Sequence, residues 1–216
     1  MSTDGLLVFA LLYGVVPAWL ALGLADWLCH HRARIELNAS WPESLMHLVQ
    51  LALVGAPLLA ALFLQVNALV ILVMLAGLVL HQAVAVIDVR YADRKRHVAP
   101  TEQHVHGGLE MVPVFATFLV VVLHWPQARS LWEGTAVFRF ELKHQPLPVW
   151  YLALVLAGVV LFAVVPYVEE LVRAIRLRPR SVTEPEATPF RLRSFAGSGG
   201  GFRHGPRAHQ TRTGNP

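Results

Sequence analysis

The sequence predicts an all-α integral membrane protein: a four-helix transmembrane bundle made of two repeated helical hairpins, plus a peripheral fifth transmembrane helix. The first observation is composition. Of the 216 residues, 55% are apolar and only 15% are charged, whereas about 25% are charged in a soluble domain. The second is a set of five long apolar segments, and the third is a repeat among the polar residues. This composition disfavours a soluble enzyme, a nucleic-acid-binding module and a disordered chain.

Each apolar segment is long enough to cross the roughly 30 Å hydrocarbon core of a bilayer as a helix. The first is not expected to be a cleaved signal peptide, because the residues before it contain Asp4 and no lysine or arginine. A tight turn at residues 65–67 joins the second and third segments. The predicted spans are Leu6–Leu28, Leu45–Leu64, Ala68–Ile87, Leu109–Trp125 and Val149–Val172.

The lysine and arginine residues predict the orientation. With the N-terminus outside, the three inside segments carry 2, 4 and 9 of them, and the outside segments carry only 3. The positive-inside rule therefore places the N-terminus outside and the C-terminus in the cytoplasm, in the inner (cytoplasmic) membrane. The predicted parts are the bundle with its metal site (1–125), an external loop (126–148), the fifth helix (149–175) and a basic, disordered cytoplasmic tail (176–216).

The acidic and histidine residues form a repeat. An aspartate closes the first span of each hairpin, and a glutamate followed four residues later by a histidine opens the second. These residues are Asp26, Glu43 and His47 in the first hairpin, and Asp88, Glu102 and His106 in the second. Residues four apart share a helix face, so His30 joins Asp26 and Glu110 joins His106. All four faces end at the same membrane side and are expected to converge.

Such a cluster of carboxylates requires cations, because like charges repel and charge at the membrane edge is costly. Histidine and carboxylate together suit Fe, Mn or Zn. We expect two metals, taken as iron with Mn or Zn as alternatives, and Glu110 as the catalytic residue, bridging the metals or bonded to their ligands. One metal is expected mainly on Asp26, His30, Glu43 and His47, and the other mainly on Asp88, Glu102 and His106.

Simpler roles exist for the same residues. Glu43 completes a capping box that begins at Ser40. His81 suits either an interhelical hydrogen bond or a reserve metal ligand. Pro57 and Pro113 would kink their spans and make room for a lipid chain. The aspartates could pair instead with nearby arginines, namely Arg32, Arg34, Arg90 and Arg94.

These residues resemble a broad class, the integral-membrane di-iron hydroxylases and desaturases that act on lipids. That class binds two irons near the cytosolic ends of spanning helices through histidine boxes. This chain has one adjacent pair, His30-His31, and lacks repeated boxes, so the resemblance covers site placement and chemistry. The ligand set looks more like ferritin-like carboxylate sites, which take a glutamate from two helices and Glu-x-x-His from two others. Here the motif is Glu-x-x-x-His, and aspartate replaces the lone glutamate.

Three functions follow as hypotheses. The first is an O2-dependent di-iron oxidoreductase that hydroxylates, desaturates or oxidises a lipid-like or quinone-like substrate, with electrons from an unknown donor. The second is a zinc-type membrane hydrolase with a glutamate as general base. The third is a b-type cytochrome or quinone-reactive subunit of a larger membrane complex, with His47 and His106 as haem ligands. No nucleic-acid partner is expected.

Overall fold

The predicted spans are long helices in the computed structural model, which describes residues 1–177. Five helices in this range have the length and apolar composition to cross a membrane. The described residues form no strand; one isolated bridge joins Leu64 to Leu142. The all-α class is therefore confirmed for the described residues, and five helices are able to cross a membrane. The predicted tail lies, apart from its first two residues, outside the described residues. The five helices are Thr3–Ala33, Trp41–Phe63, Ala68–Lys95, Pro100–Leu123 and Val149–Arg176.

The first and last spans are each interrupted by one π-helical turn. The first consists of α1 (Thr3–Ala10), η1 (Leu11–Val15) and α2 (Val16–Ala33). The last consists of α8 (Val149–Val159), η2 (Val160–Val164) and α9 (Val165–Arg176). A π turn inserts an extra residue into the helical ladder and is often found at functional sites. In both spans it precedes the segment that carries buried acidic residues.

The three middle spans are α4 (Trp41–Phe63), α5 (Ala68–Lys95) and α6 (Pro100–Leu123). Proline lies in the first turn of α4 and α6, where its missing N–H costs nothing. Asn67 caps α5 by accepting hydrogen bonds from two backbone N–H groups. The capping box expected at Ser40 is wrong, because Ser40 has a positive φ and its side chain makes no capping bond.

Two helices were not predicted. The four-residue α3 (Ile35–Asn38) joins the first two spans, and α7 (Trp125–Glu133) lies within the predicted external loop. The rest of that loop runs back along the turn between α4 and α5. The backbone N–H of Gln65 donates to Glu141 O at 2.8 Å, and that of Lys143 donates to Phe63 O at 3.0 Å. The loop is therefore held against this end of the helices.

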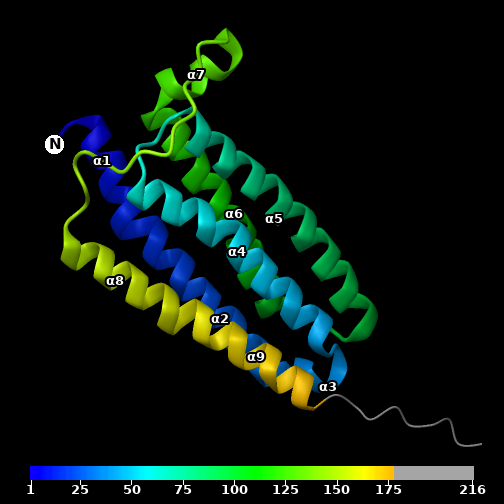
Figure 1. The fold of residues 1–216 in the computed structure, drawn as a ribbon. Helices are drawn as coiled ribbons and strands as arrows, with labels where there is room; N and C mark the ends of the chain where they lie inside the picture. Colours follow the sequence, from blue (N-terminus) through cyan, green and yellow to red (C-terminus); the bar gives the residue numbers. More distant parts are fainter. Residues whose placement is uncertain (178–216) are drawn as a thin grey trace, which may run out of the picture. The chain divides into compact units, whose positions relative to one another are not determined.

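The fifth span is not peripheral, contrary to the expectation from sequence. In Figure 1 the chain from α8 to α9 runs beside α2 and α4, and α9 packs against α2, α3 and α4. Besides these contacts, α4 packs along α5, and α6 packs against both α2 and α5. The reason that α9 packs inward is chemical: it carries Glu170, which is fully buried and bonded to two other helices.

Polar and apolar residues are buried at opposite ends of these helices. The apolar clusters lie toward the end that carries α7 and include Val70, Ile71 and Tyr151. At the end that carries α3, the buried side chains are mainly charged or polar (Figure 1). An ordinary core has the reverse preference, since burying a charge is costly unless it is paired. The buried polar end is therefore the candidate site.

Candidate metal centre

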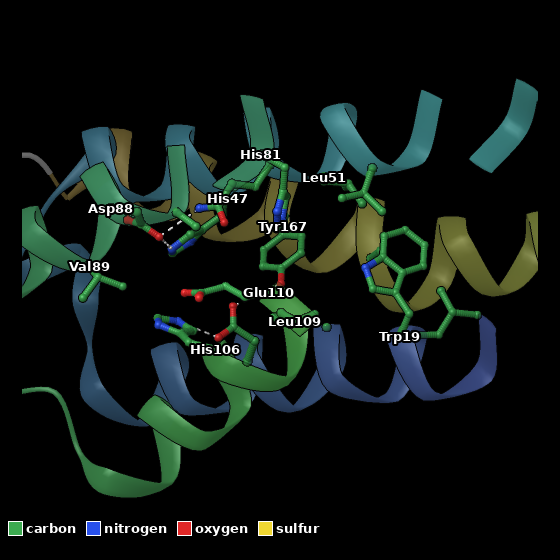
Figure 2. Close-up of a pocket in the computed structure, with 17 residues that line it drawn as sticks. Trp19, His47, Leu51, His81, Asp88, Val89, His106, Leu109, Glu110 and Tyr167 are labelled. Carbon is green, nitrogen blue, oxygen red and sulfur yellow. Dashed lines mark hydrogen bonds and ion pairs between the residues drawn. The ribbon is translucent and has the colours of Figure 1, made fainter. Parts of the chain in front are cut away.

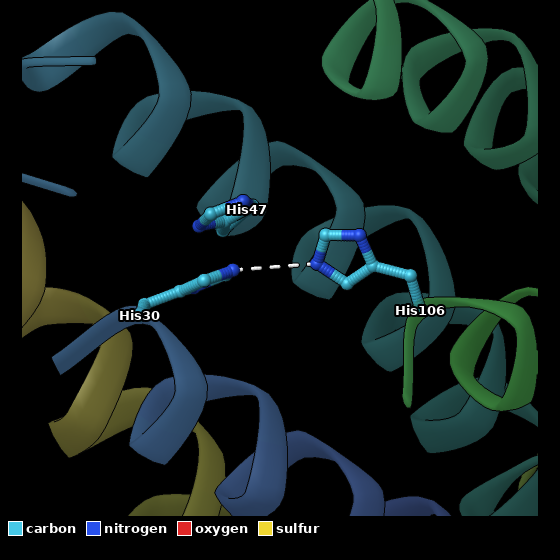
Figure 3. Close-up of side chains that lie close together, drawn as sticks. All are labelled: His30, His47 and His106. Atoms are coloured by element: carbon cyan, nitrogen blue, oxygen red, sulfur yellow. Dashed lines mark hydrogen bonds between the residues drawn. The ribbon is translucent and has the colours of Figure 1, made fainter. Parts of the chain in front are cut away.

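Three histidines from three different helices meet at the polar end. His30 comes from α2, His47 from α4 and His106 from α6 (Figure 3). The rings of His30 and His47 are stacked, with centroids 4.4 Å apart and planes 10° from parallel. The Nε2 atoms of His30 and His106 are 3.3 Å apart. One ring nitrogen from each histidine lies within 4.8 Å of the others, so the three could hold a metal ion.

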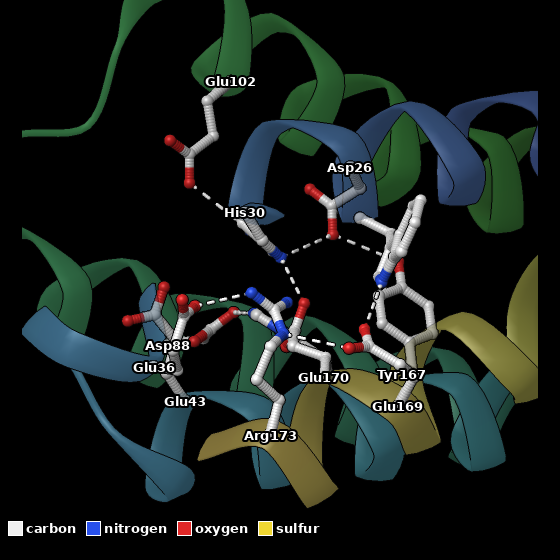
Figure 4. Close-up of polar contacts among 12 residues, drawn as sticks. Asp26, His30, Glu36, Glu43, Asp88, Glu102, Tyr167, Glu169, Glu170 and Arg173 are labelled. Atoms are coloured by element: carbon white, nitrogen blue, oxygen red, sulfur yellow. Dashed lines mark hydrogen bonds and ion pairs between the residues drawn. The ribbon is translucent and has the colours of Figure 1, made fainter. Parts of the chain in front are cut away.

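Glu170 of α9 sets the orientation of two of these rings. The Nδ1 atoms of His30 and His47 donate to its two carboxylate oxygens at 3.0 Å and 2.8 Å (Figure 4). A carboxylate only accepts, so both Nδ1 atoms carry a proton, and when the imidazoles are neutral both Nε2 atoms keep their lone pairs. Histidines that ligate metals in proteins are commonly fixed in this way, with the non-ligating nitrogen donating to a carboxylate.

The two repeated aspartates face histidines of the opposite hairpin. Asp26 Oδ1 lies 2.8 Å from His106 Nε2, and Asp88 Oδ2 lies 3.2 Å from His47 Nε2. Tyr167 of α9 donates to Asp26 Oδ2 at 3.1 Å, and Gln50 donates to Asp88 Oδ2 at 3.0 Å. The pairing is thus equivalent in the two repeats, but it crosses between hairpins. The expected division into one ligand set per hairpin does not match these contacts.

The two repeated glutamates share one guanidinium. Arg96, just after α5, contacts Glu102 and lies 2.6 Å from Glu43 Oε1. Burial by itself would lower the pKa of Arg96. The hydrogen bonds to Glu102 and Glu43 together have the larger effect, so the pKa of Arg96 is raised above its ordinary value. Glu102 also lies 3.3 Å from His30 Nε2. The expected compensation by other arginines is wrong: the side chains at positions 32, 34, 90 and 94 are exposed.

Several buried atoms in the cluster have no hydrogen-bond partner among the described residues. They include one oxygen each of Asp26, Glu43 and Asp88, together with His47 Nε2. The close approaches of Asp26 to His106 and of Asp88 to His47 therefore lack hydrogen-bond geometry. Nitrogen and oxygen atoms that would bind a cation lie side by side. A buried polar atom left without a partner costs about 1–3 kcal/mol.

The formal charge of the cluster also favours bound cations. The cluster buries five carboxylates, which are Asp26, Glu43, Asp88, Glu102 and Glu170, and its only guanidinium within residues 1–177 is that of Arg96. If all three imidazoles are neutral the formal charge is therefore −4, which two divalent cations would neutralise; each imidazole that carries a second proton makes the charge less negative by one. Protonating all three imidazoles is unfavourable, because the Nε2 atoms of His30 and His106 would then both be donors 3.3 Å apart. The donor set and its charge fit a dinuclear metal site.

A small cavity opens beside the cluster; apolar side chains form part of its wall, and we call it the polar cavity because several charged and polar side chains of the cluster reach it. It has a volume of about 50 Å³, and Asp26, His47, Asp88 and His106 line it together with Glu110 (Figure 2). The Glu110 carboxylate makes no hydrogen bond or ion pair within the described chain; only its backbone oxygen accepts, from Gln82. An unpartnered carboxylate at the edge of a cavity is free to accept a proton from a molecule bound there.

The structure thus brings together seven of the eight site residues predicted from sequence, and places the eighth, Glu110, on the cavity wall. His81, the expected reserve ligand, lines the same cavity, and its buried Nδ1 has no partner there. Sequence reasoning missed Glu170, Tyr167 and Arg96. An acidic residue inside an apolar span is a functional signal in itself, and Glu170 could have been found by it.

Other groups of side chains at this end could also hold a metal ion. Besides the three histidines, the described residues offer His30 with Glu43 and Glu102, and His47 with Glu43 and Asp88, as groups that could hold an ion. Both groups combine residues of both predicted hairpins.

No family model matches this chain, and neither the curated proteins nor the solved structures include a significant match. Its function must therefore be argued from the site.

Proposed function

We propose that this protein is a membrane-embedded dinuclear metal oxidoreductase that contains iron and uses O2 to hydroxylate, desaturate or otherwise oxidise a hydrophobic substrate. One observation carries the proposal: Glu170 orients His30 and His47 so that their Nε2 atoms face a buried group of carboxylates, several of whose oxygens have no hydrogen-bond partner among the described residues. A complete structural hydrogen-bond network would leave neither these oxygens nor His47 Nε2 without a partner. This arrangement instead presents nitrogen and oxygen lone pairs to a common centre.

The residues that would hold the metals are the three histidines through Nε2 and the four repeated carboxylates, Asp26, Glu43, Asp88 and Glu102. Mixed imidazole and carboxylate ligation suits iron and leaves coordination positions for O2 or water. Iron, when bound, supplies the electron transfer to O2. Hydroxylation places one oxygen atom in the product and the other in water, so a separate electron donor is required as a partner.

The remaining residues have supporting roles. Glu170 holds the imidazoles in one tautomer, and Tyr167 holds Asp26 in place through its hydroxyl. Glu110 holds or releases a proton at the edge of the polar cavity, which makes it the catalytic residue of the proposal. Arg96 keeps Glu43 and Glu102 close together by its positive charge.

The proposal includes an architecture and an orientation. Two repeated hairpins, α2 with α4 and α5 with α6, would form a four-helix bundle related by an axis along the membrane normal. The equivalent contacts of Asp26 with His106 and of Asp88 with His47 support this symmetry.

The positive-inside rule supports an external N-terminus and a cytoplasmic C-terminus in the inner membrane. A reporter fused at the C-terminus should be active only if it works in the cytoplasm; activity of a periplasmic reporter would reverse the orientation.

A zinc-dependent hydrolase is the second candidate. The observation that favours it is the histidine triad itself, because three imidazoles with one open position are a common catalytic zinc set. A hydrolase would use one metal and one general base, and would leave most of the buried carboxylates without a cation. A haem protein is less favourable, because the small polar cavity between His47 and His106 is lined by carboxylates.

Metal analysis of the purified protein with its visible spectrum tests the proposal. We expect about two iron ions per chain, as in ferritin-like carboxylate sites, and no Soret band. About one zinc ion per chain, with no iron after expression in iron-supplemented medium, would favour the hydrolase. A Soret band would overturn the dinuclear proposal, because that absorption belongs to haem.

A further inference from the structure

A second cavity lies between the helices on the side away from the charged cluster. Its volume is about 190 Å³, and residues of α1, η1, α2, α4, α5 and α6 line it. Nearly all of these residues are apolar. Helices border it on several sides, and it also opens at the outside of the helices, where Val8 is exposed. Ligand pockets for drug-sized molecules are usually about 300–1,000 Å³, so this one suits a thinner occupant.

Irregular backbone creates this space. The π turn η1 lines it from the first span, Pro57 lines it from α4, and Pro113 lines it from α6. Proline within a helix removes a hydrogen bond and kinks the axis. Small side chains at Ala61 and Ala116 leave further room. Two prolines within helices and one π turn, from three different spans, therefore line one volume.

The two ends of this apolar cavity differ in chemistry. At the inner end, Trp19 and Val54 line both this cavity and the polar cavity, so the two are adjacent. At the outer end lie His124 and Lys143. Phe63, whose backbone oxygen accepts from the Lys143 N–H, lies nine positions after Val54 on α4. This separation corresponds to roughly 14 Å at about 1.5 Å per residue. That length is about half the 30 Å hydrocarbon core, the depth of one leaflet.

Lys143 is the cation at the outer end. Its side chain is half-buried and makes no ion pair within the described part of the chain; the nearby Glu141 pairs with His144 instead. Burial lowers the pKa of Lys143, because the ammonium loses hydration. His124 beside it also has a lowered pKa, through burial and the Lys143 charge. An anion bound here would restore favourable interactions to both groups.

We propose that this cavity binds one amphiphile with a single apolar chain and an anionic carboxylate head, as in a fatty acid. The carboxylate pairs with Lys143, and the chain extends along α4 toward Trp19. The narrow volume takes the part of one chain that lies between Lys143 and Trp19, whereas the two chains of a phospholipid exceed it. Binding does not depend on metal; if the proposed oxidoreductase function holds, the far end of the chain is the part that meets the metal site.

Palmitate binding to the full-length protein tests this inference. The protein is reconstituted in nanodiscs of neutral phosphatidylcholine after chelation of metal, so that the result is independent of the metal proposal. Palmitate and the neutral hexadecanol are titrated against the unmodified chain, Lys143→Met and Lys143→Arg. We expect Lys143→Met to weaken palmitate binding roughly tenfold, which corresponds to about 1.4 kcal/mol, close to the lower limit for a hydrogen bond to a charged group. Lys143→Arg should retain it, and hexadecanol affinity should be the same in all three.

A second pair of variants tests the cavity itself. Ala116→Phe places a ring in the cavity, whereas Ala153→Phe adds the same ring at an exposed position on α8. Palmitate binding should be lost only in Ala116→Phe, provided that both variants elute as the unmodified protein does on size exclusion. A palmitate analogue with a photoreactive group at its far end should label the region of Trp19.

Three results would overturn the inference. They are unchanged palmitate affinity in Ala116→Phe, equal weakening by Lys143→Arg and Lys143→Met, or labelling confined to the outer end. A loss of palmitate binding in Ala153→Phe would mean that the signal reports partition into the surrounding membrane. If palmitate fails to bind but iron is present, this inference is wrong and the proposed function stands. If palmitate binds as expected but the purified protein contains no iron, this inference stands and the proposed function is wrong.

Discussion

The replacement Glu170→Gln tests the metal proposal at the residue on which it most depends. Glutamine has the shape of glutamate, so the change leaves no cavity. However, its amide has one accepting oxygen and one donating nitrogen, whereas Glu170 accepts from both His30 Nδ1 at 3.0 Å and His47 Nδ1 at 2.8 Å. One histidine must then face a second donor. That ring would move its proton to Nε2, the atom proposed to bind metal.

The expected loss follows from this geometry. Replacing a residue that orients a metal-binding histidine typically lowers metal affinity 10–100-fold, which corresponds to about 1.4–2.8 kcal/mol. Fe²⁺ titration of metal-free protein under anaerobic conditions, with a competing chelator, measures this affinity. We expect Glu170→Gln to bind at least one iron ion about 10–100-fold more weakly than the unmodified chain.

The adjacent glutamate provides a matched control. Glu169 accepts from Trp27 and Arg173 at the surface, and its side chain is 43% exposed. Glu169→Gln removes the same charge one residue away without touching a histidine, so iron affinity should change little. Equal affinity in the two variants would refute the argument, because it would show that Glu170 is an ordinary buried hydrogen-bond acceptor.

Three other predictions concern the ligands, the proton path and helix packing. His47→Ala and His106→Ala should each lower iron content and activity, because each variant removes one of the three imidazoles that converge on the site; full iron content in both variants would end the dinuclear proposal. Glu110→Gln should keep iron content but lower turnover, and unchanged turnover would remove Glu110 from the mechanism. Gly77→Ala should lower the thermal unfolding midpoint in detergent, because the new Cβ would lie 2.6 Å from a backbone oxygen of α4, and overpacking costs about 1–3 kcal/mol. Gly55→Ala, where the Cβ meets nothing within 4 Å, is its control, and equal midpoints would contradict the expected clash.

The sequence was sufficient to predict features that depend on neighbouring residues. The five spans follow from continuous apolar stretches, because any helix of that length and composition is favoured in a bilayer. The shared faces of Asp26 with His30 and of Glu43 with His47 follow from the helical period. Because these positions lie at the same end of their spans, convergence of the predicted ligands could also be expected. The span ends were less certain: α5 continues to Lys95, well past the predicted end at Ile87.

Side-chain partners across helices could not be obtained in the same way. Glu170 binds a histidine 140 residues earlier in the chain, and the rotation of α9 that permits this contact depends on packing against α2 and α4. The cation beside Glu43 was expected among the arginines of the helix ends, yet it is Arg96, which follows the last residue of α5.

Sequence by itself determined the membrane class, the number of spans and the residues that gather at one end. These depend on hydrophobicity and on a fixed helical period, both of which are local properties. Only the tertiary structure decided that the fifth span belongs to the site, that the aspartates pair across hairpins, and that an apolar cavity lies next to the polar one. Those features depend on how helices rotate and kink against one another, and that is set by the packing of residues distant in the chain.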